Sequence, residues 1–265
     1  MRHDSPLRLR PEPISSGPDK PPAPPPAAER VPLGIAHADE WLGGGLAAAG
    51  LHEAYAAKME DGAAAIGFAL ALARMRAGSS AAPLVWLRQR GRPSIPYGPG
   101  LHQFGIAPAQ VTLLALPDAK SVLRAASDCA RDGAAAAVLL ELAGRQRLLD
   151  LTASRRLVLA AARTGTMLLL VRQGAEPSPS AAQTRWRVAS APSRALAANT
   201  PGRPAFDLAL TRHKGGRDGL QLILEWNNEQ ACFAEPPASA ASPLHGAVPA
   251  MASGGERAAQ RPRAA

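Results

Sequence analysis

The stretch that decides the fold reads LHEAYA over residues 51–56 and AKMEDGAA over residues 57–64. The first six residues follow a glycine-rich turn and predict a β-strand. Residues 61–75 predict a helix that opens at Asp61, an acceptable N-cap. Its larger apolar residues lie near one face: Ile66, Leu70 and Leu72. A strand that passes through a short loop into a helix is the repeating unit of α/β proteins.

The same alternation continues along the chain. Further apolar runs predict strands at residues 83–87, 111–116, 136–142 and 167–171, and helical patterns lie between them at residues 119–130 and 150–162. In the second of these helices, Leu151, Val158 and Leu159 are predicted to lie on the buried side. This pattern favours an α/β fold with a mainly parallel sheet flanked by helices.

The pattern of apolar and polar residues changes after Gln183. Residues 184–189, 206–211 and 220–226 alternate apolar with polar side chains, which is typical of strands buried on one face. Lys214-Gly215-Gly216-Arg217 lies between the last two and predicts a hairpin turn. We therefore expect an antiparallel extension, with C-terminal strands and a hairpin, added to the parallel core.

Both ends of the chain differ in composition from this unit. Residues 1–32 contain ten prolines, and the chain from about residue 234 onward is rich in Ala, Pro, Ser and Gly. Such segments bury too little apolar surface to offset the entropy of ordering them. The sequence predicts a disordered Pro-rich tail at 1–30, one domain at 31–233 and a disordered Ala/Pro-rich tail at 234–265.

Charge and cysteine content exclude several classes of protein. The net charge is +9, from 30 Lys and Arg against 21 Asp and Glu, and 26 of the cations are arginine. This excess fits either a nucleic-acid partner or a GC-rich coding sequence. Cys129 and Cys232 predict neither a zinc site nor a disulfide framework. No leader segment and no apolar run of about 20 residues is found, so we expect a cytoplasmic protein with no membrane contact.

The loop after the first strand has the position and spacing of a nucleotide-binding P-loop. That motif needs two glycines, a lysine that neutralises phosphates and a hydroxyl that binds Mg²⁺. Here Gly62 is the glycine that survives, whereas Ala63 and Ala64 replace the lysine and the hydroxyl residue. Lys58 has two interpretations, a lysine that reaches the site from a shifted position or a solvated turn residue. The sequence predicts a degenerate P-loop.

Glu141 ends a buried strand, where the Mg²⁺-side acid of such proteins stands. An isolated glutamate at this position is also common as a cap or an ion-pair partner, so we interpret it as vestigial. The histidines are scattered, and no GxSxG or HExxH motif occurs. We expect no catalytic site, no metal and no cofactor.

A basic strip follows the parallel core. Residues 185–217 carry seven cations against one acid, Asp207. The candidate contact residues are Arg185, Trp186, Arg187, Arg212, Lys214 and Arg217. Arginines that alternate with an aromatic residue can stack on bases, and a basic turn can contact phosphates. The alternatives are a protein-docking surface and a solvated face without a partner.

Several motifs together carry a family resemblance. VPLGI (31–35), LGGGL (42–46) and LHE (51–53) resemble the entry to a RecA-type core. More specific are DLTASRRL (150–157), TRWRV with APS (184–188 and 191–193), PGRP (201–204) and LEW (224–226). As a set they resemble the ImuA family of RecA-like accessory proteins of bacterial inducible mutagenesis, in its alphaproteobacterial form. The resemblance covers residues 31–233.

The resemblance implies a non-enzymatic role in damage-induced (SOS) translesion DNA synthesis. The implied partners are ImuB, a Y-family polymerase homologue without polymerase activity, and, indirectly, an error-prone C-family polymerase. RecA and DNA are further partners that it leaves open, although no segment resembles the two DNA-binding loops of RecA. Two other functions remain as alternatives: a nucleotide-binding RecA-like ATPase that uses Lys58 and Glu141, and a cell-division inhibitor similar to SulA.

Overall fold

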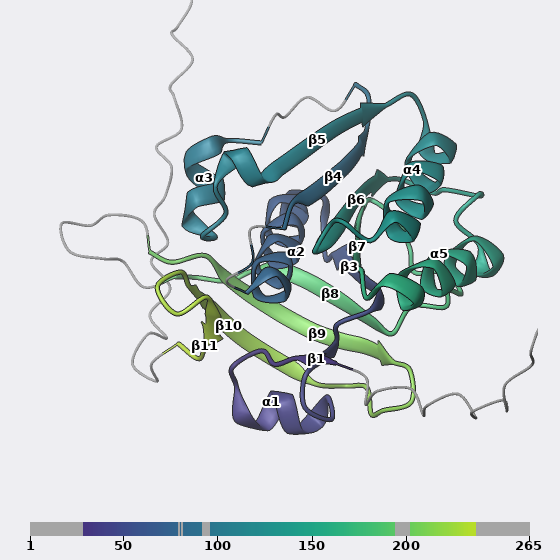
Figure 1. The fold of residues 1–265 in the computed structure, drawn as a ribbon. Helices are drawn as coiled ribbons and strands as arrows, with labels where there is room; N and C mark the ends of the chain where they lie inside the picture. Colours follow the sequence, from purple (N-terminus) through teal and green to yellow (C-terminus); the bar gives the residue numbers. More distant parts are fainter. Residues whose placement is uncertain (1–28, 79, 81, 92–95, 194–201, 237–265) are drawn as a thin grey trace, which may run out of the picture.

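The computed structural model describes residues 29–78, 80, 82–91, 96–193 and 202–236. Nearly all of the two tails predicted at 1–30 and 234–265 therefore lies outside the described residues. The described residues form a nine-stranded sheet with helices on both faces, and a small two-stranded sheet lies beside it (Figure 1).

The larger sheet has the strand order β11-β10-β9-β8-β3-β7-β6-β4-β5. The six strands from β8 to β5 are parallel to one another. Their bounds are β3 Gly50–Ala56, β4 Leu84–Gln89, β5 Val111–Leu116, β6 Ala137–Ala143, β7 Met167–Gln173 and β8 Thr184–Ser190. The strands expected in this region are confirmed to within two residues at each end.

The antiparallel part of the sheet begins one strand later than predicted. β8 runs parallel to β3, with His52 opposite Thr184 and Ala56 opposite Val188. The antiparallel strands are β9 Ala205–His213, β10 Gln221–Asn227 and β11 Cys232–Ala234. Alternating apolar and polar residues report that one face of a strand is buried, but they carry no information on strand direction.

The helices pack on opposite faces of the sheet. They are α1 Ala36–Trp41, α2 Gly62–Ala77, α3 Gly98–Gln103, α4 Ala119–Asp132 and α5 Leu151–Thr164. Two 3₁₀ turns are η1 Met59–Asp61 and η2 Pro108–Gln110. The small sheet pairs β1 Arg30–Val31 with β2 Leu46–Ala47. α2 packs into one hydrophobic core, whereas α4 and α5 form another on the opposite face. Among the described helices, none combines the length and apolarity needed to cross a bilayer.

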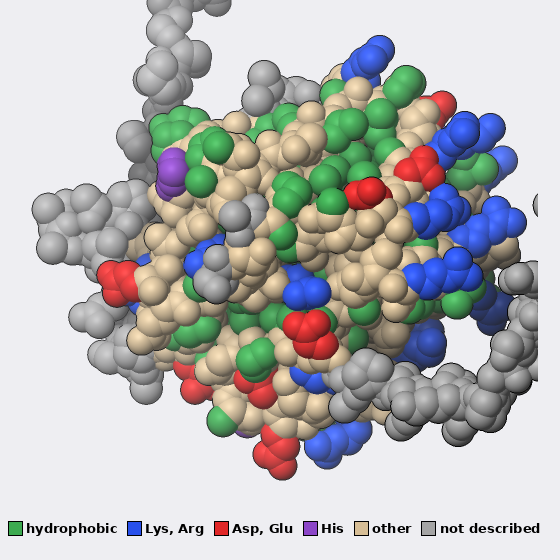
Figure 2. All heavy atoms as spheres, viewed as in Figure 1, with side chains coloured by type: hydrophobic (Ala, Val, Ile, Leu, Met, Phe, Trp, Pro, Cys, Tyr) green, Lys and Arg blue, Asp and Glu red, His purple; other side chains and the backbone are tan. Residues whose placement is uncertain are grey.

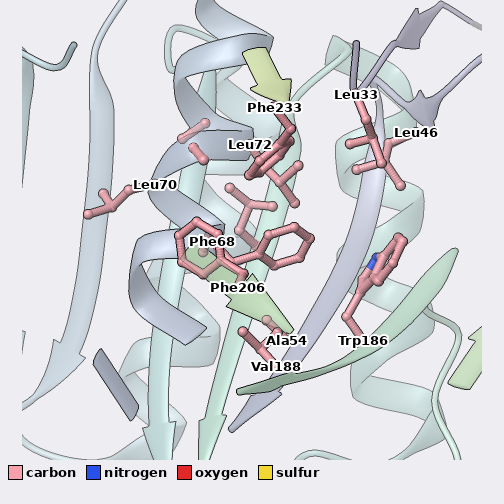
Figure 3. Close-up of a cluster of buried hydrophobic side chains, with 14 of the residues drawn as sticks. Leu33, Leu46, Ala54, Phe68, Leu70, Leu72, Trp186, Val188, Phe206 and Phe233 are labelled. Atoms are coloured by element: carbon pink, nitrogen blue, oxygen red, sulfur yellow. The ribbon is translucent and has the colours of Figure 1, made fainter. Parts of the chain in front are cut away.

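Aromatic side chains fill the core between α2 and the antiparallel strands (Figure 3). Phe68 of α2 has its ring centroid 5.6 Å from that of Trp186 in β8 and 5.8 Å from that of Phe233 in β11. Gly67 allows this close packing, because a Cβ there would lie 3.0 Å from Phe104 and 3.3 Å from Phe206. Several of the few aromatic residues of this protein therefore lie where the C-terminal strands pack against α2.

The buried side of α5 is not the one that we predicted. Leu151 and Leu159 are exposed, and α5 instead buries Ser154, Leu157, Ala160 and Ala161. The Ser154 hydroxyl donates to the Asp150 carbonyl and accepts from the Ala181 amide at 3.0 Å, in the segment that leads into β8. Because that segment passes close to α5, the small residues face inward together with Leu157, and Leu151 and Leu159 face solvent.

We expect Phe68→Ala to lower the free energy of unfolding by about 3–5 kcal/mol, because it removes the ring that contacts three other aromatic side chains. Urea unfolding monitored by tryptophan fluorescence and by circular dichroism measures the change. Ile223→Ala, at an exposed position of β10, is the matched control and should change stability by less than about 0.5 kcal/mol. Equal losses in the two variants would contradict this view of the core.

Candidate functional site

The loop from β3 to α2 lies at the carboxyl ends of the parallel strands, where open α/β sheets bind ligands. β3 ends at Ala56, η1 occupies Met59–Asp61 and α2 begins at Gly62. The strand, loop and helix predicted from the sequence are therefore confirmed.

Asp61 fastens this loop to the end of β8. Its carboxylate accepts hydrogen bonds from the Ser190 amide and hydroxyl, both at 2.9 Å, and from the Lys58 amide at 3.2 Å. The expected capping of α2 by this side chain is wrong, because the carboxylate makes no hydrogen bond to the first turn of the helix. In a P-loop the backbone amides face a phosphate. Here the Asp61 carboxylate, which belongs to the loop itself, already accepts a hydrogen bond from the Lys58 amide.

The electrostatics of Asp61 follow from these contacts. Burial alone raises the pKa of the carboxyl group, but the hydrogen bonds from Ser190 and Lys58 outweigh burial, and the pKa lies below its ordinary value. The group is therefore a carboxylate at neutral pH.

The predicted phosphate-side residues offer little to a nucleotide. The Lys58 side chain is 73% exposed, and its ammonium lies 4.0 Å from Glu60, which agrees with a solvated turn lysine. Ala63 and Ala64 lie at the start of α2, where Ala63 is exposed and Ala64 half-buried. A Cβ at Gly62 would lie 2.9 Å from the tip of the side chain of Gln173, the last residue of β7, so a larger residue here would require that side chain to move.

Glu141 is an ion-pair partner. It lies near the end of β6, is 2% exposed and has its Oε2 atom 3.6 Å from Nε of Arg88 in β4. The Trp86 indole also donates to the same oxygen at 3.3 Å. The carboxylate is therefore neutralised and oriented by protein groups. In the part of the chain that the structure describes, no group of three or more His, Cys, Asp or Glu side chains could hold a metal ion.

Ala63, Ala64, Arg88 and Glu141 line one cavity of about 450 Å³. Most of its remaining lining is apolar and comes from α2, α3, β4 and β9: Ile66, Leu70, Trp86, Leu101, Phe104 and Phe206. A nucleoside triphosphate with Mg²⁺ needs cations and hydroxyls around its phosphates. This cavity instead presents mostly apolar side chains, the Arg88–Glu141 ion pair and the polar side chains of Tyr97, Gln103 and Ser190. The Ser190 hydroxyl already donates to Asp61.

The basic strip does not form one surface. Trp186 is fully buried in the aromatic core, so the prediction that it alternates with arginines on an exposed face is wrong. Arg185 Nε donates to Glu53 Oε2 at 2.7 Å. Arg212 donates to the Ser180 carbonyl. The side chains of these two arginines are therefore engaged in contacts within the protein.

The remaining cations of the strip differ in their surroundings. Arg187 and Lys214 are exposed. The Arg217 guanidinium lies 4.4 Å from the centre of the Trp41 ring, whose indole donates to the Arg217 carbonyl at 3.0 Å. Arg194 lies outside the described residues.

The sequence analysis missed a polar cluster on β3. Glu53 pairs with Arg185, and the guanidiniums of Arg172 and Arg185 lie 5.9 and 5.5 Å from the centre of the Tyr55 ring. Burial raises the pKa of Tyr55, and Glu53 adds to this effect. The sequence did contain a signal for this cluster, namely Glu53 within a predicted strand. A carboxylate buried in a strand needs a partner such as a cation on a neighbouring strand.

The strand order and the loop after β3 define a RecA-like α/β domain whose phosphate-loop position carries neither the lysine nor the hydroxyl. A solved structure described as the RadB recombinase superposes with a TM-score of 0.52 at 15% identity, over 78% of this chain and 99% of that one. Proteins named Protein ImuA from two strains of Caulobacter vibrioides are 31% identical over 194 residues, which cover 68% of this chain and 77% of each relative. The chain belongs to the ImuA family. No family model matches it.

We expect Arg185→Ala to destabilise the protein by about 3–5 kcal/mol, because it leaves the buried Glu53 carboxylate without its cation. Arg187→Ala, two residues away on the same strand, is the matched control and should cost less than about 0.5 kcal/mol. Chemical unfolding measures both. The double variant Glu53→Gln/Arg185→Met should recover much of the loss, and failure of this rescue would contradict the ion-pair explanation.

We expect Asp61→Asn to lower stability at pH 7 by about 1–3 kcal/mol, because it weakens three hydrogen bonds to a charged acceptor. The pKa of Asp61 is lower in the folded protein, so its contribution is complete above the unfolded-state value of about 3.9. It is lost as the pH falls through the folded-state value.

Urea unfolding at a series of pH values tests this effect. The difference between wild type and Asp61→Asn should shrink at the acid end, whereas the exposed neighbour Glu60→Gln should have little effect at any pH. A difference that stays constant with pH would assign the loss to packing instead.

Proposed function

We propose that this chain is a non-catalytic accessory protein of damage-induced translesion DNA synthesis. Membership of the ImuA family supports the connection to inducible mutagenesis, and the RecA-like fold supplies a scaffold. The proposed role is that of a cytoplasmic adaptor that positions other proteins, without hydrolysis of ATP.

One observation carries the non-catalytic part of the proposal. In the cavity at the loop after β3, Ala63 and Ala64 stand where phosphates need a cation and Mg²⁺ needs a hydroxyl. Glu141 is also already paired with Arg88. The alternative of an ATPase that uses Lys58 is less well supported, because that side chain extends into solvent beside Glu60.

The proposed partners follow from the family. They are an ImuB-like Y-family polymerase homologue, through which the chain meets an error-prone C-family polymerase. RecA and DNA are further partners to be examined in the same assembly. Arg187, Lys214 and Arg217 are the exposed cations of the strip in the described residues for a DNA contact, and Arg217 also packs on Trp41. Arg185 and Arg212 are engaged within the fold.

The test combines nucleotide binding with function in cells. Fluorescent ATP with Mg²⁺ is expected to show no saturable binding to the full chain at micromolar concentrations. Lys58→Ala is expected to restore damage-induced mutation frequency in a strain that lacks this protein, to the level given by the wild type.

A RecA protein with an intact P-loop is the positive control for the binding assay. Micromolar ATP binding that Lys58→Ala abolishes, together with loss of induced mutagenesis in that variant, would overturn the proposal in favour of the ATPase. Failure of the wild-type chain to co-purify with the co-encoded Y-family homologue would overturn the adaptor role.

A further inference from the structure

The outward face of α5 combines exposed leucines with arginines. Leu151 and Leu159 are 38% and 65% exposed, and Leu148 in the preceding loop is 55% exposed. Of the eight exposed large apolar residues in the described part of the chain, three therefore lie within twelve residues. Leu151, Arg155 and Leu159 are four residues apart and form one stripe along the helix. This face is where the sequence predicted burial.

α4 places further arginines beside Arg156, which lies one turn before Leu159 on α5. A hollow of about 360 Å³ lies between α4 and α5, and Arg124, Arg131 and Arg156 line it together with Leu123 and Leu157. The rest of the lining is Ser127, Asp128 and Ala153, so the hollow combines arginines with a few apolar and polar side chains.

The surroundings of the hollow are positively charged. α4 and α5 together carry six cations against two acids, and the acids are both on α4. Arg131 pairs with Asp128 at 2.9 Å. Among the described residues, no ion pair involves Arg124, Arg155 or Arg156. Figure 2 shows Lys and Arg side chains gathered on the side of the molecule over α4 and α5, with apolar side chains between them.

The combination of charge and apolar exposure selects one kind of occupant. Nucleic acid would satisfy the arginines but would leave the leucines in water, because phosphate contacts bury no apolar side chain. A second copy of this chain would bring the same cations against themselves in a symmetric dimer. An amphipathic helix with acidic flanks satisfies both features, since its apolar stripe covers the leucines and its carboxylates meet the arginines.

We propose that the α4–α5 face binds an acidic, amphipathic helical segment of a partner protein. The α4–α5 face consists of Leu123, Arg124, Arg131, Leu151, Arg155, Arg156, Leu159 and Arg163. It is separate from the cavity beside α2, and its test does not depend on the absence of nucleotide binding.

The experiment is fluorescence anisotropy on the full chain with three labelled probes. The first is an 18-residue peptide with leucines at i, i+3, i+4 and i+7 spacing and glutamates elsewhere. The second has the same composition with its leucines distributed around the helix, and the third is an oligodeoxythymidine of equal charge. The first probe should bind at least tenfold more tightly than the other two, with an affinity that falls as salt rises.

Variants locate the site. Leu159→Ser and Arg156→Glu should each weaken binding of the first probe at least tenfold. Leu113→Ser on β5 and Arg90→Glu after β4 are the matched controls, because they change an exposed leucine and an exposed arginine elsewhere. All four variants should keep the wild-type Tm within a few degrees. A peptide with lysines in place of the glutamates next to the leucine stripe should recover part of the binding to Arg156→Glu.

The opposite results would overturn the proposal. These are no binding of the first probe, equal binding of the distributed-leucine peptide, or equal losses in the control variants. Tighter binding of the oligonucleotide, lost in Arg156→Glu but kept in Leu159→Ser, would assign the face to nucleic acid.

Discussion

The pairing of β3 with β8 connects the two parts of the sheet, and buried polar contacts fix it. Arg185 donates to Glu53 at 2.7 Å, and the His52 ring contacts Thr184 Oγ1 at 2.8 Å. Burial lowers the pKa of His52 to about 4, so the ring is neutral at physiological pH. A shift of one residue between the strands would separate both pairs and leave buried polar groups unpaired. The register of β8, and hence the placement of β9 to β11, depends on these contacts.

Much of the fold could be predicted from local pattern. The strands of the parallel core, the loop at residues 57–61 and the hairpin at Lys214–Arg217 follow from apolar periodicity and turn residues. The direction of β8 could not be predicted, because alternation reports burial and not polarity of the chain. The rotation of α5 depends on a contact between Ser154 and Ala181, which are 27 residues apart. The burial of Trp186 likewise depends on strands that follow it in the sequence.

The candidate site was predictable in its residues but not in their partners. The sequence located Gly62, Ala63, Ala64 and Glu141 at the positions of a P-loop and its acid. It did not indicate that Arg88 would neutralise Glu141 or that aromatic residues from α3 and β9 would line the same cavity. Those partners come from separate segments, and tertiary packing alone brings them together. The glycine that survives lies close to the end of the Gln173 side chain, a neighbour that the sequence did not indicate.

The aromatic packing around α2 also constrains motion. Nine of the sixteen residues of α2 are buried, and Gly67 allows no larger side chain against Phe104 and Phe206. Phe68 of α2 packs against Trp186 of β8, Phe206 of β9 and Phe233 of β11, so α2 cannot shift along the sheet without breaking these ring contacts. The last strands of the chain and the helix that follows the loop at residues 57–61 are therefore coupled through these rings, although they lie far apart in the sequence.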